Sequence, residues 1–206
     1  MVSTYPVQFD VDYPARPLNR LTTGFRIFLA IPILIVLSLL PSETLHSSDR
    51  THMYETAIGG GLVFLSLVLM LVFRQKYPRW WFDWNLNFLR FSYRISAYVF
   101  LLDDRYPSTD EEQAVHLEFP YPDAGQLNRW LPLVKWLLAI PHYIVLFFLA
   151  IGAVVAAIIA WFAILFTGTY PRGLFDYVVG VFRWSNRVTG YAFALVTDQY
   201  PPFSLR

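Results

Sequence analysis

The sequence contains no cysteine and few charged residues. Lys, Arg, Asp and Glu together make up only 15% of the 206 residues, whereas 56% are hydrophobic. The absence of cysteine excludes disulfides, thiolate metal sites, iron–sulfur clusters and a cysteine nucleophile. A net charge of +1 gives no reason to expect a nucleic-acid partner. A chain this apolar is unlike a typical soluble domain, and we expect an integral membrane protein.

The long apolar segments also lack acidic residues. Transporters coupled to protons or ions usually carry an ionisable residue at depth, so this absence disfavours them. We recognise no catalytic, metal or cofactor motif, and expect no enzyme activity, no metal and no cofactor. A lipid-modifying enzyme would need Asp83 or Asp176 as its base. His142 follows Pro141 in an apolar stretch; we expect it to hydrogen-bond to a neighbouring helix, with cofactor ligation as the open alternative.

Several short motifs occur twice in the same order, which indicates an internal repeat. The repeated motifs are Leu18-Asn19-Arg20 with Leu127-Asn128-Arg129, Ala30-Ile31-Pro32 with Ala139-Ile140-Pro141, Tyr77-Pro78-Arg79 with Tyr170-Pro171-Arg172, and Phe82-Asp83 with Phe175-Asp176. We therefore predict two units, residues 1–108 and 109–206. Each unit contains a strand, an apolar hairpin and an amphipathic helix.

Each unit begins with a segment of alternating apolar and polar residues. In residues 7–13 and again in residues 115–121, every second side chain is apolar, the pattern of a half-buried strand. We predict that the strands around Phe9 and Leu117 pair as a short cytoplasmic β-ribbon. Such a ribbon is marginal alone, so its apolar face should rest on the amphipathic helices.

The apolar stretches predict an all-α membrane fold with four transmembrane helices in two hairpins. The first hairpin comprises residues 16–40 and 57–73, and the second comprises residues 130–166 with its turn at Gly152. Spans of sufficient length require Arg26 and Lys135 to extend to the headgroups. Pro32 and Pro141 should kink their helices.

The distribution of basic residues predicts the orientation. Of the 16 Lys and Arg, all but Arg50 lie before or in the initial part of the first span, between the second span and the initial part of the third, or after the fourth. The positive-inside rule then places both termini in the cytoplasm. We expect a multi-pass protein of the cell inner (plasma) membrane, with the two hairpins arranged as parallel repeats.

Residues 79–102 and 172–196 predict interfacial amphipathic helices rich in aromatic side chains. Each carries two arginines spaced i, i+4, and therefore on one face of a helix: Arg90 with Arg94, and Arg183 with Arg187. With Trp80 and Trp184 at the headgroup level, these arginines form a candidate anionic-lipid site. The alternative is pairing with Asp83, Asp176 or a strand carboxylate.

The second unit resembles a bacterial membrane family known as domain of unknown function 4389. The resemblance rests on three segments: Val134-Lys135-Trp136-Leu137-Leu138-Ala139-Ile140-Pro141-His142, Phe166-Thr167-Gly168-Thr169-Tyr170-Pro171-Arg172-Gly173, and Arg183-Trp184 with Tyr200-Pro201-Pro202-Phe203. In the first unit, Arg26 stands where the second has Lys135, and Trp80 follows Arg79. The resemblance implies a membrane location and no particular activity.

These observations favour a non-enzymatic membrane protein that works by assembly. We expect an accessory subunit or scaffold of a membrane assembly, in contact with anionic lipids. A protein partner or a second copy of the chain would lie beside it in the membrane. The alternatives are a protein that shapes the membrane with its hairpins and a transporter or channel for a small solute.

Overall fold

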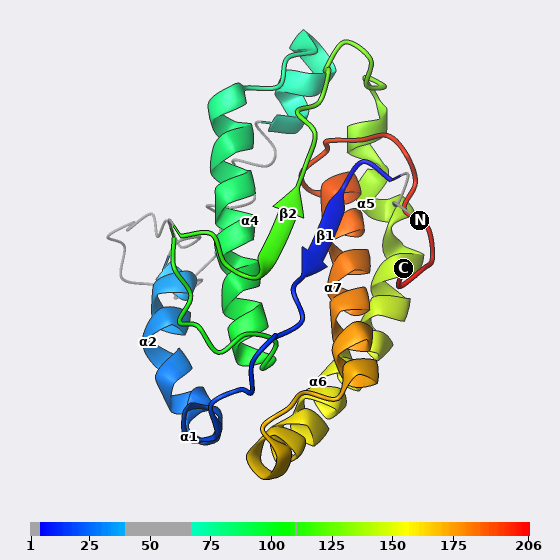
Figure 1. Ribbon diagram of the computed structural model, residues 1–206. Helices are drawn as coiled ribbons and strands as arrows, with labels where there is room; N and C mark the ends of the chain where they lie inside the picture. The colour runs from blue at the N-terminus through cyan, green and yellow to red at the C-terminus, as the bar shows by residue number, and fades with distance from the viewer. Residues whose placement is uncertain (1–4, 40–66, 110) are drawn as a thin grey trace, which may run out of the picture.

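A ribbon of two strands lies in front of a layer of helices (Figure 1). The computed structural model describes residues 5–39, 67–109 and 111–206. Strand β1 (Gln8–Val11) pairs antiparallel with β2 (Val115–Glu118), with Phe9 opposite Leu117. This confirms the predicted pairing of the two strands.

The helices follow the strands in chain order. After β1 come α1 (Arg20–Gly24), α2 (Arg26–Leu39), the π-helical turn η1 (Met70–Arg74) and α4 (Arg79–Val99). After β2 come the 3₁₀ turn η2 (Leu131–Leu133), α5 (Lys135–Leu138), α6 (Ile140–Thr167) and α7 (Arg172–Ala192). The two predicted amphipathic segments are therefore helices, each beginning directly after a Tyr-Pro pair.

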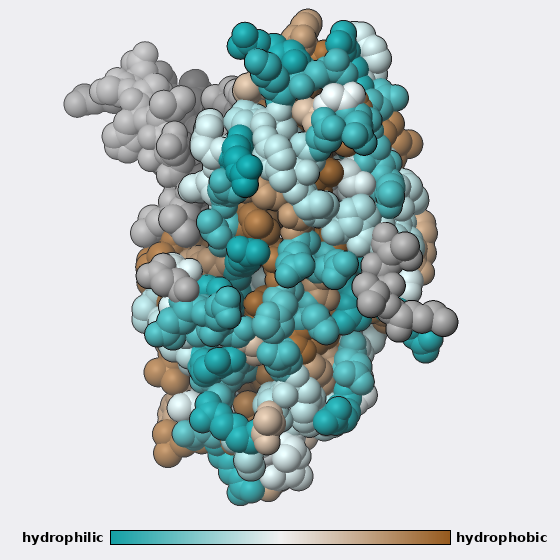
Figure 2. All heavy atoms as spheres, turned by 45° about the horizontal axis from the view of Figure 1, so that its top comes forward, coloured by the Kyte–Doolittle hydropathy of each residue, from teal (hydrophilic) through white to brown (hydrophobic). Residues whose placement is uncertain are grey.

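Each strand packs on the amphipathic helix of the other predicted unit. Strand β1 contacts α7 and β2 contacts α4, while α1 contacts α6. Phe9 and Leu117 point into the core, whereas Asp10 and Glu118 are exposed. The apolar face of the ribbon therefore rests on the helices, as predicted, and the two units interlock. Figure 2 includes the strand side and shows a mainly hydrophilic surface with apolar residues toward its edges.

Helix α6 corrects the prediction of a second apolar hairpin. It is one continuous helix of 28 residues, and Gly152 lies in its interior. The glycine allows close packing, since a Cβ there would collide with the Tyr177 hydroxyl of α7. The chain turns instead at Gly168, whose φ of 77° suits glycine, and α7 then runs back along α6 (Figure 1).

Four membrane spans are not confirmed. Among the described residues, α6 is the one helix long and apolar enough to cross a membrane, and α2 is a shorter apolar helix of 14 residues. Residues 57–66, most of the second predicted span, lie outside the described residues. Pro32 is inside α2, as predicted, but Pro141 is in the first turn of α6, where proline fits without kinking the helix.

Candidate functional site

One arginine of each predicted pair bonds to the strand ribbon. Arg183 Nε on α7 donates to the Phe9 carbonyl at 2.9 Å, and Arg90 Nε on α4 donates to the Leu117 carbonyl at 3.0 Å. Phe9 and Leu117 are the residues that face each other across the ribbon. Corresponding arginines of the two predicted units therefore make the same contact with opposite strands.

Arg183 also reaches a strand carboxylate. Its Nη2 lies 2.8 Å from Asp10 Oδ1, and its Nη1 donates to the Leu205 carbonyl at 3.2 Å. Asp83 and Asp176, the other two predicted carboxylate partners, are exposed, and neither forms an ion pair among the described residues. The strand carboxylate is thus the partner that the geometry selects.

Arg187 and Arg94 bind backbone carbonyls. The Arg187 side chain is buried and donates to the carbonyls of Ser204 and Arg206 near the C-terminus. Burial lowers the pKa of its guanidinium. Arg94 Nη1 donates to the Ser108 carbonyl at 2.7 Å. A headgroup contact by Arg187 does not fit this position, because the side chain is buried and both of its Nη atoms donate to carbonyls inside the protein.

The two tryptophans of the predicted lipid site lie in different environments. Trp80 is 70% exposed, whereas Trp184 is buried and its Nε1 donates to His142 Nδ1 at 3.0 Å. The Trp184 prediction is therefore wrong: this indole lies between helices and away from the surface. Of the predicted lipid-site residues, Trp80 keeps the exposure that an interfacial role requires.

His142 packs within an aromatic cluster. The bond from Trp184 confirms the expected hydrogen bond to a neighbouring helix, and the Phe203 ring stacks on the imidazole with centroids 4.0 Å apart. Because Nδ1 accepts, Nε2 carries the proton in the neutral ring. No group of three metal-ligating side chains occurs in the described ranges.

Two cations that the sequence pattern places at the membrane surface are buried. Arg26 and Lys135 were expected to extend to headgroups, but their residues are 2% and 0% exposed. Arg26 Nη1 donates to the Tyr98 and Asp103 carbonyls, and its guanidinium lies over the Tyr98 ring. A signal for these buried cations was available in the sequence. Arg26 and Lys135 occupy matching positions in the two predicted units, and the amphipathic helix of each unit carries a tyrosine that the cation contacts, Tyr98 and Tyr191.

Lys135 is the better-neutralised of the two cations. Its Nζ donates to the Thr197 carbonyl at 2.8 Å and lies 2.7 Å from Asp198 Oδ1. The ammonium also lies 5.2 Å from the centroid of the Tyr191 ring. Burial lowers the pKa of Lys135, against the opposing effect of Asp198.

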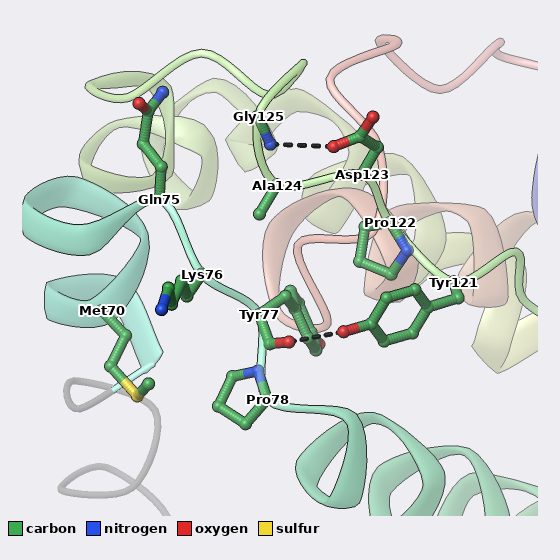
Figure 3. A pocket seen from close by; sticks show the side chains of 10 residues that line it. All are labelled: Met70, Gln75, Lys76, Tyr77, Pro78, Tyr121, Pro122, Asp123, Ala124 and Gly125. Carbon is green, nitrogen blue, oxygen red and sulfur yellow. Dashed lines mark hydrogen bonds between the residues drawn. The ribbon is translucent and has the colours of Figure 1, made fainter.

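A crevice lies between the segment that leads into α4 and the segment that follows β2 (Figure 3). It has a volume of about 540 Å³. The Tyr121 hydroxyl donates to the Tyr77 carbonyl at 2.6 Å, and the Gly125 amide donates to Asp123 Oδ1 at 3.0 Å. These polar groups satisfy one another and form no arrangement of nucleophile and base.

The comparison with known families covers most of the second unit. Residues 130–204, which include α5, α6, α7 and most of the C-terminal segment, match the family model described as Domain of unknown function (DUF4389). This region is therefore similar to that family. Lys135, His142, Trp184 and Arg187 all lie within the DUF4389 region. No curated protein and no solved structure matched the chain.

Proposed function

We propose that this chain is a non-enzymatic membrane protein that serves as an accessory subunit or scaffold of a membrane assembly. One observation carries the proposal: α2 and α6 expose large apolar side chains along their outer faces. Phe28 on α2 and Phe148 on α6 are each more than 60% exposed. A soluble monomer rarely exposes an apolar surface of this extent, so lipid or a partner protein should cover it.

The polar ribbon constrains how the protein sits in the membrane. The segment that contains β1 begins near Tyr5, whose hydroxyl donates to the Gln199 carbonyl. It ends near Leu18, whose amide donates to the Gly168 carbonyl at the end of α6. The ribbon therefore extends alongside the helices (Figure 1). If α6 crossed the bilayer upright, exposed Asp10 and Glu118 would lie at membrane depth, where charge is costly.

Embedding in one leaflet avoids this cost. The apolar faces of α2 and α6 would lie in lipid, and the ribbon would face water on the cytoplasmic side of the inner membrane. The basic residues are consistent with this placement, because Arg129 precedes α6 and Arg172 follows it. Both ends of the helix therefore carry positive charge, which favours the cytoplasmic side of the membrane. Trp80 would lie among the headgroups.

The proposed arrangement includes the internal repeat. Matched contacts support it: the Tyr13 hydroxyl donates to the Tyr170 carbonyl at 2.5 Å, as the Tyr121 hydroxyl does to the Tyr77 carbonyl at 2.6 Å. These pairs of residues correspond in the two predicted units. They connect the units crosswise, as the strands do.

Single cysteines introduced into this cysteine-free chain test the placement of α6. Gln126→Cys and Thr169→Cys put exposed thiols near its two ends. In sealed inner-membrane vesicles, we expect an impermeant maleimide to label both from the cytoplasmic side. Labelling from opposite sides would overturn the one-leaflet placement and require a partner protein to cover the ribbon.

The scaffold role is tested by isolating the tagged chain at native abundance in a mild detergent. We expect a particle larger than the monomer, containing another membrane protein or further copies of the chain. A strictly monomeric particle with no companion would refute an assembly role.

Membrane shaping is the second candidate, favoured by the same one-leaflet placement. Protein inserted into one leaflet expands that leaflet and promotes curvature. Purified chain added to liposomes at increasing loading should then reduce their diameter. Unchanged diameters at high loading would exclude this function and leave the scaffold role standing.

A further inference from the structure

An apolar cavity of about 540 Å³ lies where α1 meets α2, the end of α4 and the middle of α6. This volume is in the range of small-molecule sites. The Trp161 indole of α6 donates to the Thr23 carbonyl at 3.0 Å and connects α6 to the α1 end of the cavity. The apolar lining includes Ile27, Val154, Ala157, Ile158 and Phe162.

Arg26 lines this cavity, and its buried guanidinium has two donors without a partner in the described part of the chain. Nη1 is occupied by the carbonyls of Tyr98 and Asp103, and the Tyr98 ring lies 4.4 Å from the guanidinium carbon. Nε and Nη2 are buried and have no hydrogen-bond partner among the described residues. These two atoms form one edge of the guanidinium, which is the fork that binds a carboxylate or phosphate with two parallel hydrogen bonds.

The neighbouring carboxylates do not neutralise Arg26 by pairing with it. Asp103 pairs with Arg105 at 2.9 Å, and Asp104 pairs with Arg16 at 2.8 Å. Thr23, which is 0% exposed and also lines the cavity, has a hydroxyl oxygen without a partner. Leaving such buried polar groups unpaired is costly, so an anionic acceptor that reached them would stabilise this part of the fold.

We propose that this cavity binds an amphiphile with an acyl chain and an anionic head, with the head on Arg26 and the chain along the apolar wall. Ile27 and Phe162 are at least half exposed, so the rim is apolar and suits entry of a chain from lipid. The site goes beyond the proposed scaffold role and does not depend on it. A free fatty acid and an anionic phospholipid share this chemistry.

Lys135, at the matching position in the second predicted unit, differs from Arg26 in its partners. Lys135 is satisfied by Thr197 and Asp198, so its charge has no need of an external anion. Arg26 has carbonyl partners on one side only. The two buried cations therefore differ in their unpaired hydrogen-bond donors, although their positions in the two predicted units correspond.

The test measures binding of cis-parinaric acid, a fluorescent fatty acid, to the purified full chain in neutral detergent. Ala157→Phe fills the cavity, and Ala150→Phe places the same side chain on an exposed part of α6 outside it. We expect saturable binding with one site per chain, at least tenfold weaker in Ala157→Phe and unchanged in Ala150→Phe. Equal affinities in both variants and the unmodified chain would overturn the proposal. Melting curves verify that both variants fold.

The role of the anionic head is tested without altering the protein. Oleate should displace the probe at a concentration at least tenfold lower than oleyl alcohol, which lacks the charge that Arg26 would bind. Equal displacement would refute the assignment of Arg26. Stronger competition by dioleoylphosphatidylglycerol than by oleate would identify a membrane lipid as the source, and the reverse a free fatty acid. These measurements use the chain alone, so they are independent of whether an assembly partner exists.

Discussion

Replacing Arg183 by glutamine separates a structural arginine from a lipid-binding one. The side chain donates to the Phe9 and Leu205 carbonyls and pairs with Asp10. Each hydrogen bond from a charged group contributes roughly 1.5–3 kcal/mol. The ion pair adds at most about 1 kcal/mol, because the Asp10 side chain is 70% exposed. Glutamine is shorter and retains part of the donor capacity, so we expect a net loss of about 3 kcal/mol.

A loss of that size is readily measured. For a chain of this length, about 3 kcal/mol corresponds to a decrease in Tm of roughly 6–12 °C. The seven tryptophans allow melting to be followed by intrinsic fluorescence, in neutral detergent with and without phosphatidylglycerol. Arg90→Gln is the matched variant, since Arg90 makes the equivalent bond to the Leu117 carbonyl, and it should cost less. Asp10→Asn removes only the ion pair and should cost under about 1 kcal/mol.

The opposite pattern would refute a structural role. If Arg183→Gln melts within 1 °C of the unmodified chain (about 0.5 kcal/mol or less) in detergent but is no longer stabilised by phosphatidylglycerol, Arg183 binds lipid. A loss in detergent alone, with lipid stabilisation retained, supports the contacts described above.

Further predictions concern packing, the buried ammonium and alkaline pH. Gly190→Ala should destabilise the fold by about 1–3 kcal/mol, because a Cβ would lie 2.5 Å from a Val7 methyl; Gly173→Ala has open space and should cost nothing in the same melts. Lys135→Met should cost about 2–3 kcal/mol, and adding Asp198→Asn should recover part of that in a double-mutant cycle. Burial raises the pKa of Tyr77 above its ordinary 10.0, so its contribution is intact below pH 10.0 and is lost as the pH rises further. Tm should fall above that pH, and less steeply in Tyr77→Phe; equal slopes would contradict the assignment.

The strand register and the amphipathic helices could be predicted from the sequence. Strict alternation around Phe9 and Leu117 leaves one face for the core, and shifting the register by one residue would expose it. The helices α4 and α7 follow from the proline signals before Arg79 and Arg172 and from the periodic apolar face of each helix. For the strands and for these helices, the local sequence pattern and the tertiary contacts favour the same secondary structure.

The second hairpin and the lipid site could not be predicted in the same way. Gly152 resembled a turn because the surrounding residues are uniformly apolar, and periodicity alone does not divide such a run. The contact with Tyr177 is tertiary and does not appear in the sequence. Ala153, Ala156 and Ala160, all buried, were a usable signal, since small residues on one face favour close packing between helices. The arginines were assigned to the surface because sequence does not show which backbone carbonyls will lack partners.

The exchange of strands also bears on the DUF4389 region itself. Its helix α7 packs on β1, which lies outside residues 130–204. Val7 meets Gly190, and the Phe9 carbonyl accepts from Arg183. Without β1, the apolar surface around Gly190 would be exposed to water, which is unfavourable. Arg183 would also lose the hydrogen bond that it donates to the Phe9 carbonyl. The apolar face of α7 is therefore covered by a strand from outside residues 130–204, and in this chain β1 supplies it.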